Sequence, residues 1–149
     1  MSRKKIPNVD EYNPVIYPRI LWVAKSIEAC EGYFTFLAND GSDREVSYDS
    51  ILKNIEDDGG IMMTCQVMRN ADNKLGVLVV FADIDEMNST VIPHEAVHVA
   101  DYFCEQLGIC TQDFSSSNEP YAYLVGWAGG CISKTLSDLK ADKYDEGRG

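Results

Sequence analysis

The sequence is poor in positive charge. Thirteen Lys and Arg residues stand against 24 Asp and Glu residues, which gives a formal net charge of -11 at pH 7. Nucleic-acid phosphates are bound by clustered Lys and Arg, and the only such cluster here is Arg3-Lys4-Lys5. The acidic balance also disfavours an anionic membrane surface. We therefore expect neither nucleic acid nor membrane among the partners.

Long apolar runs are absent as well. No stretch approaches the roughly 20 apolar residues that cross a bilayer. The basic N-terminus is followed by Asn, Asp, Glu and Pro, where a secretion signal has an apolar segment. These two absences predict a cytoplasmic protein that is not secreted by a recognisable signal.

The cysteines lack a pattern that pairs them. There are five, at positions 30, 65, 104, 110 and 131. Because the number is odd and no C-x-x-C occurs, neither a disulfide framework nor a cysteine zinc cage is indicated. We expect free thiols, buried or half-buried, in a reducing compartment.

The length and composition are those of one globular domain. The chain has 149 residues, of which 45% are hydrophobic and 25% charged. We expect a single domain over residues 1–149. Prolines at positions 7, 14 and 18 predict an extended N-terminal arm over residues 1–18. Residues 140–149 are expected to form a frayed tail.

Strand signals dominate the first half of the chain. Asn39-Asp40-Gly41 is a strong turn signal between aromatic and β-branched residues, and a second turn is expected at Asn70 to Lys74. The segment 51–60 is ambiguous. The pattern predicts about four to five antiparallel strands, built from a short buried strand in 19–25, a hairpin in 33–50 and a hairpin in 61–83. Residues 76–82, the most apolar run, are expected to form a central strand.

The periodicity becomes helical from Thr90 onward. A helix is expected to begin after Ser89 or Thr90 and to end at Gly108. A second helix is expected from Asn118 or Glu119 to about Asp138. Glycines at positions 126, 129 and 130 of this helix predict close packing against a neighbour. Strands followed by two C-terminal helices indicate an α+β fold.

Both histidines of the chain lie in the pentad His94-Glu95-x-x-His98. On a helix, positions i and i+4 share one face, so both imidazoles can reach a single zinc ion. Glu95 is rotated by about 100° from His94. It can therefore act as the general base toward a metal-bound water. The pentad predicts a catalytic zinc site.

An ordinary surface helix also fits the same residues. His94 and His98 lie opposite the apolar stripe, on the side shared with Asp101 and Glu105. A solvent-facing polar side has this pattern, and H-E-x-x-H occurs by chance in helices. A third metal ligand would distinguish the two interpretations.

A catalytic zinc site needs three protein ligands and a water. Asp101 lies about 10.5 Å along the helix from His94, too far to share the ion, so we expect it to orient His98 by a hydrogen bond. Asp113 in the following loop remains open. Glu119, at the start of the second helix, is the preferred third ligand. A carboxylate stabilised by the helix dipole is the alternative for Glu119.

The stretches "HEAVH" and "NEPYAYLVGW" together resemble the zincin metallopeptidases, in the gluzincin arrangement H-E-x-x-H…E. The resemblance covers about residues 90–127. It implies a minimal zincin-like fold, Zn²⁺ as cofactor, and a peptide or protein as substrate. The chain also resembles small proteins of tailed phages and prophages, which implies the cytoplasm of a bacterial host.

The sequence departs from the family in two respects. Tyr123 stands where thermolysin-like proteins have an aspartate that supports a zinc histidine. No third histidine is present to stabilise the tetrahedral intermediate, so a tyrosine would have to donate to the oxyanion. The candidates are Tyr102, Tyr121 and Tyr123. We expect Tyr123, one turn beyond Glu119, to act with Glu95 as a catalytic residue, although a core aromatic is an equal alternative.

Three functions remain open. The first is a zinc-dependent metallopeptidase, which uses His94, Glu95, His98 and Glu119. The second is a catalytically inactive zincin-fold protein that binds metal or serves as a phage structural or host-interaction component. The third is a metal-free interaction module. For the peptidase, the acidic segment 83–91 is expected to border the substrate cleft.

Overall fold

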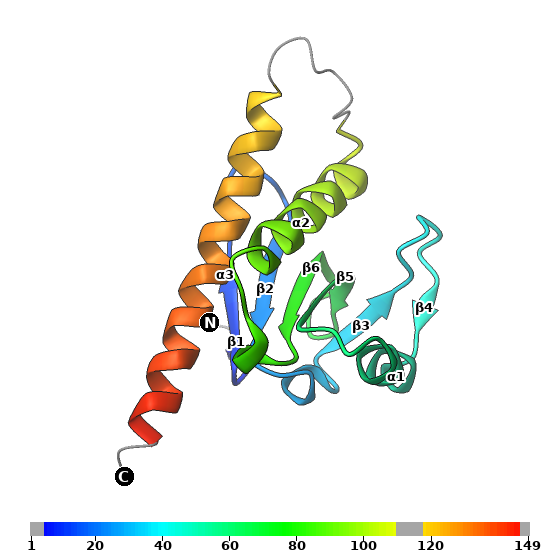
Figure 1. Cartoon of the computed structure of the whole chain (residues 1–149). Helices are drawn as coiled ribbons and strands as arrows, with labels where there is room; N and C mark the ends of the chain where they lie inside the picture. The colour runs from blue at the N-terminus through cyan, green and yellow to red at the C-terminus, as the bar shows by residue number, and fades with distance from the viewer. Residues whose placement is uncertain (1–4, 110–117, 147–149) are drawn as a thin grey trace.

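The protein is an α+β domain in which one sheet is covered by helices on both faces (Figure 1). The structure is a computed structural model, and it describes residues 5–109 and 118–146. Helices α2 and α3 pack on one face and contribute to one apolar cluster. Helix α1 covers the other face at the β3–β4 end, within a second cluster. The expected α+β class is confirmed.

Within the described residues, the sheet has six strands in the order β1-β2-β6-β5-β3-β4. The strands are β1 (Val9–Tyr12), β2 (Ile20–Ala24), β3 (Phe34–Leu37), β4 (Glu45–Val46), β5 (Met62–Arg69) and β6 (Lys74–Phe81). Neighbours are antiparallel except β2 and β6, which are parallel. The prediction of a purely antiparallel sheet was therefore wrong. Both hairpins form and β6 is a central strand, but β4 ends at Val46 and residues 48–50, expected in the first hairpin, begin α1.

The arrangement is not a zincin fold, so the fold implied by the H-E-x-x-H resemblance was also wrong. The physical reason lies in what the motif specifies. The pentad fixes five positions on one helix, but it does not fix how strands far away in the chain pair with each other. Here β6 is inserted between β2 and β5, a long-range pairing that no local pattern encodes.

Strands β2 and β6 are close enough to require a glycine between them. Gly76 of β6 pairs with Ile20 of β2. A Cβ at Gly76 would lie 2.2 Å from the backbone oxygen of Ile20 and 2.7 Å from the Trp22 ring. Position 76 therefore accepts no side chain without displacing backbone.

In the part of the chain that the structure describes, three α-helices and two short 3-10 helices accompany the sheet. They are α1 (Tyr48–Asp58), α2 (Val91–Leu107), α3 (Glu119–Glu146), η1 (Glu28–Cys30) and η2 (Ile84–Glu86). Helix α1 occupies most of the segment that the sequence left ambiguous. The Ser47 side chain accepts a hydrogen bond from the Ser50 amide, and Gly59 ends the helix in the left-handed conformation.

Helix α3 packs along α2, but only one of its glycines serves that packing. A Cβ at Gly129 would lie 3.8 Å from the Ala96 Cβ, whereas Gly126 and Gly130 face open space. The prediction that all three glycines admit a neighbour is thus met at one of them. The helix also continues to Glu146, so residues 140–146 are helical rather than a frayed tail.

The N-terminal arm contributes an edge strand. Strand β1 pairs with β2, and Tyr12 reaches across to α3, where its hydroxyl lies 2.7 Å from Thr135 Oγ1. Thr135 donates in turn to Asp10 Oδ2 at 2.7 Å. The buried Thr135 therefore links the N-terminal strand β1 to the C-terminal helix α3.

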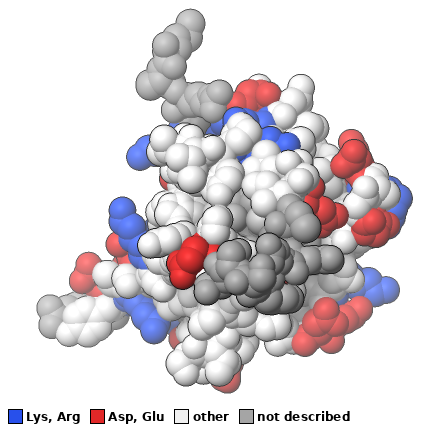
Figure 2. Space-filling model, turned by 90° about the horizontal axis from the view of Figure 1, so that it is seen from above, with Lys and Arg blue, Asp and Glu red and all other residues white. Residues whose placement is uncertain are grey.

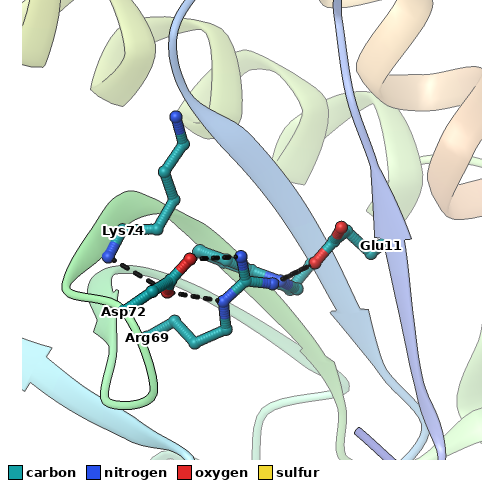
Figure 3. Close-up of polar contacts among 5 residues, drawn as sticks. Glu11, Arg69, Asp72 and Lys74 are labelled. Atoms are coloured by element: carbon teal, nitrogen blue, oxygen red, sulfur yellow. Dashed lines mark hydrogen bonds and ion pairs between the residues drawn. The ribbon is translucent and has the colours of Figure 1, made fainter. Parts of the chain in front are cut away.

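Arg69 ties β5 to β1 and to the turn that follows β5 (Figure 3). Its guanidinium donates to both carboxylate oxygens of Asp72 at 2.9 Å and pairs with Glu11. It also lies 5.3 Å from the centre of the Trp22 ring. This largely buried arginine has its charge balanced on two sides, so it acts as a structural group.

The surface seen from above carries separated charges rather than one basic surface, within the part of this face that the structure describes (Figure 2). Acidic side chains lie mostly toward its periphery. Among the described residues, no helix is long and apolar enough to span a membrane.

Candidate metal centre

Helix α2 presents the two histidines of the pentad on the side away from the core. Ala96, Val99, Ala100 and Phe103 are buried against the sheet and α3. Positions 94 and 98 then fall on the opposite side by the helical repeat. His94 is exposed and His98 half-buried. The helix therefore places both imidazoles where an ion and a substrate can reach them.

The two imidazoles converge on one point. Their Nε2 atoms lie 3.1 Å apart, and the ring centroids are separated by 4.8 Å. An ion bound by both nitrogens needs bonds of about 2.0–2.1 Å, and a separation of 3.1 Å permits two such bonds. The pair fits two ligand positions of a zinc site.

Glu95 points toward the sheet rather than into solvent. Its side chain is buried, and the Thr64 hydroxyl of β5 donates to Glu95 Oε2 at 2.5 Å. One carboxylate oxygen is therefore held by a strand. The other carboxylate oxygen of Glu95 takes no part in the bond to Thr64. A carboxylate fixed in this way is oriented, as a general base requires.

An open hollow adjoins the pentad, and we call it the histidine hollow. It has a volume of about 480 Å³, and both His94 and Glu95 line it. Its other walls are residues 59–62, which lead into β5, together with Asn88, Thr90 and Val91. The segment 83–91, expected to border a cleft, thus contributes three residues to this one.

The third expected ligand stands apart from the histidines. Glu119 is exposed at the start of α3, where it lines a different hollow with Tyr123. Within residues 5–109 and 118–146, no three His, Cys, Asp or Glu side chains form a group that could hold a metal ion. Asp113, the other carboxylate considered, lies outside the described residues.

Asp101 has a different hydrogen-bond partner from the one expected. Its Oδ1 accepts a bond from the Tyr121 hydroxyl of α3 at 2.6 Å. Burial and the nearby Asp101 carboxylate together raise the pKa of Tyr121 well above its usual value. The phenol therefore stays protonated and joins the two helices near the histidines.

The tyrosines differ in their position around the histidine pair. Tyr102 stacks beside His98, with ring centroids 6.3 Å apart. Tyr123, the residue that the sequence favoured, is 76% exposed. It shares its hollow with Glu119 and not with the histidines. Tyr102 is thus the phenol that the structure brings to His98.

Thr64 is the one residue at this centre that the sequence did not indicate. It comes from β5, some thirty positions before Glu95, and its contact with Glu95 is a long-range one. A threonine inside an apolar strand is common and carries no chemical signature. Only the packing of α2 on β5 reveals its role.

Comparisons with known proteins give no relative. No family model matches the chain, no curated protein matches it, and no solved structure matches it. The chemistry of this centre must therefore be inferred from its own side chains.

Proposed function

We propose that the protein is a zinc-dependent metallopeptidase that hydrolyses peptide bonds. The observation that carries this proposal is the convergence of the His94 and His98 Nε2 atoms, 3.1 Å apart. Glu95 lines the same open hollow as His94. The two imidazoles supply two of the three protein ligands of a catalytic zinc site, and the oriented carboxylate supplies its base.

In this proposal His94 and His98 hold Zn²⁺, with Glu119 as the third ligand. Glu119 is exposed on α3, whose first turn already contacts α2 through the bond from Tyr121 to Asp101, so this turn has to shift toward the histidines when metal binds. A zinc ion held there would supply a water of lowered pKa as the nucleophile. Glu95 would be the residue that takes a proton from that water and returns it to the leaving amine.

Donation to the developing oxyanion falls to a tyrosine in this proposal. Tyr102 stacks on His98, while Tyr123 is directed to solvent on α3. We therefore prefer Tyr102 to Tyr123 for this role. A phenol that keeps its proton can donate one hydrogen bond to the oxyanion. Asp101, through Tyr121, positions α3 against α2.

A peptide is the substrate that the surroundings of the centre favour. Strand β3 pairs with β5 only as far as Leu37 and Gln66. In the described chain, Met62–Cys65 of β5 is therefore paired on one side, by β6. An extended peptide can add to such an open strand edge through backbone hydrogen bonds. Met62 also lines the histidine hollow, so an added strand would lead to the histidines.

Metal binding without proteolysis is the second candidate. It is favoured by the position of Glu119 away from the histidines and by the bond that Thr64 makes to Glu95. A site of this kind would hold the ion through the imidazoles and leave Glu95 as a buried link between α2 and β5. It would suit a phage structural or host-interaction protein.

The two candidates are separated by Glu95→Gln and His98→Ala. For a peptidase, Glu95→Gln keeps zinc and lowers the rate of peptide cleavage by about 10²-fold or more, the usual scale for a lost general base. His98→Ala should lose zinc and cleavage together. Glu105→Gln is the matched control, because Glu105 is an exposed carboxylate on the same helix. Zinc content is measured by elemental analysis, and cleavage with a peptide library.

Each outcome decides between the candidates. Cleavage that survives in full in Glu95→Gln would refute Glu95 as the base. Zinc bound with no cleavage of any library member would favour the binding protein. Less than about a tenth of a zinc per chain, after zinc has been supplied, would end both proposals.

A further inference from the structure

Strand β5 borders a second hollow, which we call the edge hollow. It has a volume of about 430 Å³. Four consecutive residues, Met62 to Cys65, line it. Successive side chains of a strand point to opposite faces, so a cavity above one face would be lined by alternate residues. A hollow lined by four in a row lies at the edge of the strand.

The far wall of the edge hollow is apolar. It is formed by the end of β3, by β4 and by one side of α1, through Leu37, Val46, Ile51 and Ile55. Ile51 is buried and Ile55 half-buried. The hollow therefore extends from the open backbone of β5 to a hydrophobic surface on the opposite side.

The two hollows share two lining residues at the start of β5, Gly60 and Met62. A chain segment seated along Met62–Cys65 would span about 13 Å at the usual rise of a strand. One of its ends would lie at the wall that carries His94 and Glu95.

We propose that the edge hollow is a specificity pocket that receives one large apolar side chain of the peptide substrate. This inference rests on the proposed peptidase function, because it takes the peptide to lie along β5. In an added strand, alternate side chains point to the α1 face of the sheet. The side chain that enters beside Ile51 and Ile55 exchanges water for an apolar surface.

The rim of the hollow selects against acidic side chains. Asp58, at the end of α1, is one of the residues that line it. Arg44, the basic residue of this lining, already lies 3.8 Å from Asp40. A carboxylate entering the hollow would meet the charge of Asp58 and would exchange water for the apolar wall formed by Ile51 and Ile55. Leucine, methionine or phenylalanine is therefore expected in the pocket, and glutamate is excluded.

The test measures peptide binding to the full chain without metal. Uncharged, capped seven-residue peptides carry one varied residue, X, in a Thr- and Val-rich host, and X is moved along the host so that every register is sampled. Affinity is measured in EDTA by fluorescence anisotropy. The best X = Leu peptide should bind at least about 10-fold more tightly than its X = Ala counterpart. The X = Glu peptide should bind most weakly.

Two helix variants probe the pocket directly. Asn54 is exposed on α1 and lines the hollow, so Asn54→Trp places an indole inside it. This variant should reduce the affinity for the X = Leu peptide to that for X = Ala. Lys53→Trp is the matched control, because Lys53 is an exposed neighbour that does not line the hollow. It should leave both affinities unchanged.

The failure of this inference can be distinguished from that of the peptidase. His98→Ala should lose zinc-dependent cleavage and keep the metal-free preference for X = Leu. Equal affinity for Leu, Ala and Glu peptides, or an Asn54→Trp variant that binds as the wild type does, would overturn the specificity pocket even if zinc-dependent cleavage is found. A preference for Leu without any cleavage would retain the pocket and refute the peptidase.

Discussion

The two halves of β5 are neighbours in sequence and differ in their surroundings. Gln66–Arg69 is paired on both sides, by β3 and β6, and ends in the Arg69 ion pairs. Met62–Cys65 is paired by β6 alone within the described chain and lines the edge hollow, and Met62 also lines the histidine hollow. One strand thus provides a rigid support at one end and an accessible edge at the other. The comparison indicates that an accessible strand edge needs a fully paired segment of sheet beside it to hold it in place.

The largest expected effect comes from Gly76→Ala, which should disturb Gln66–Arg69, the half of β5 that is paired on both sides. Gly76 lies opposite Val67 of β5. An added Cβ would meet the Ile20 backbone oxygen at 2.2 Å. Because backbone must move, we expect a loss of about 3 kcal/mol in the free energy of unfolding, measured by urea titration.

Gly126→Ala is the control for that substitution. A Cβ at Gly126 meets nothing within 4 Å, so alanine in this helix should stabilise the protein by about 0.5–1 kcal/mol. Equal effects at the two glycines would contradict the close approach of β2 and β6.

Amide hydrogen exchange compares the two halves of β5 directly. In an antiparallel pair, alternate residues direct their N–H and C=O groups away from the partner strand. Those amides should exchange about 10- to 100-fold faster in residues 62–65 than in residues 66–69, because only the latter have β3 as a second partner. The rates are measured by NMR. Equal protection in both halves would show that the edge is closed.

The smallest expected effect concerns Cys65, whose thiol is buried although its backbone lies at the open edge. Burial raises the pKa of Cys65 well above its ordinary value of 9.0. The folded state therefore holds this proton more tightly than the unfolded state. The resulting stability is complete below about pH 9 and is lost as the pH rises toward the folded-state pKa.

The measurement is the urea midpoint at pH 8 and pH 10. We expect this thiol to account for about 1 kcal/mol of the loss at pH 10, and Cys65→Ala should lose correspondingly less stability over the same interval. The tyrosines with raised pKa values add to the total loss in both proteins. An identical loss in the variant would show that water reaches the thiol.

The sequence predicted those elements whose signals are local. The turn at Asn70 to Lys74 predicted the β5–β6 hairpin, and Gly108 predicted the end of α2. The parallel pairing of β2 with β6 was not predicted, because their partners lie at positions such as 20 and 76. Helix α1 was left ambiguous despite Ser47, since its two C-terminal glycines obscured a short amphipathic pattern.

The same distinction holds for the candidate site. The convergence of His94 and His98 follows from the helical repeat, so their spacing was sufficient to predict it. The bond from Thr64 to Glu95 and that from Tyr121 to Asp101 depend on which elements pack together. Glu119 remains a predicted ligand. Its place next to the histidines would need contacts between helices that local sequence does not determine.

The parallel pairing of β2 and β6 also constrains how the chain is made. Strand β2 has no partner on its inner side until β6, with residues 25–73 in between, has been synthesised. The segment Ile20–Ala24 is buried along its whole length in the fold. During translation it can pair only with β1 until β6 has emerged. Such a strand is exposed to other chains and to chaperones in the interval. We infer that the β5–β6 hairpin is the step that withdraws this segment from aggregation, so the folding yield should depend on how quickly that hairpin closes.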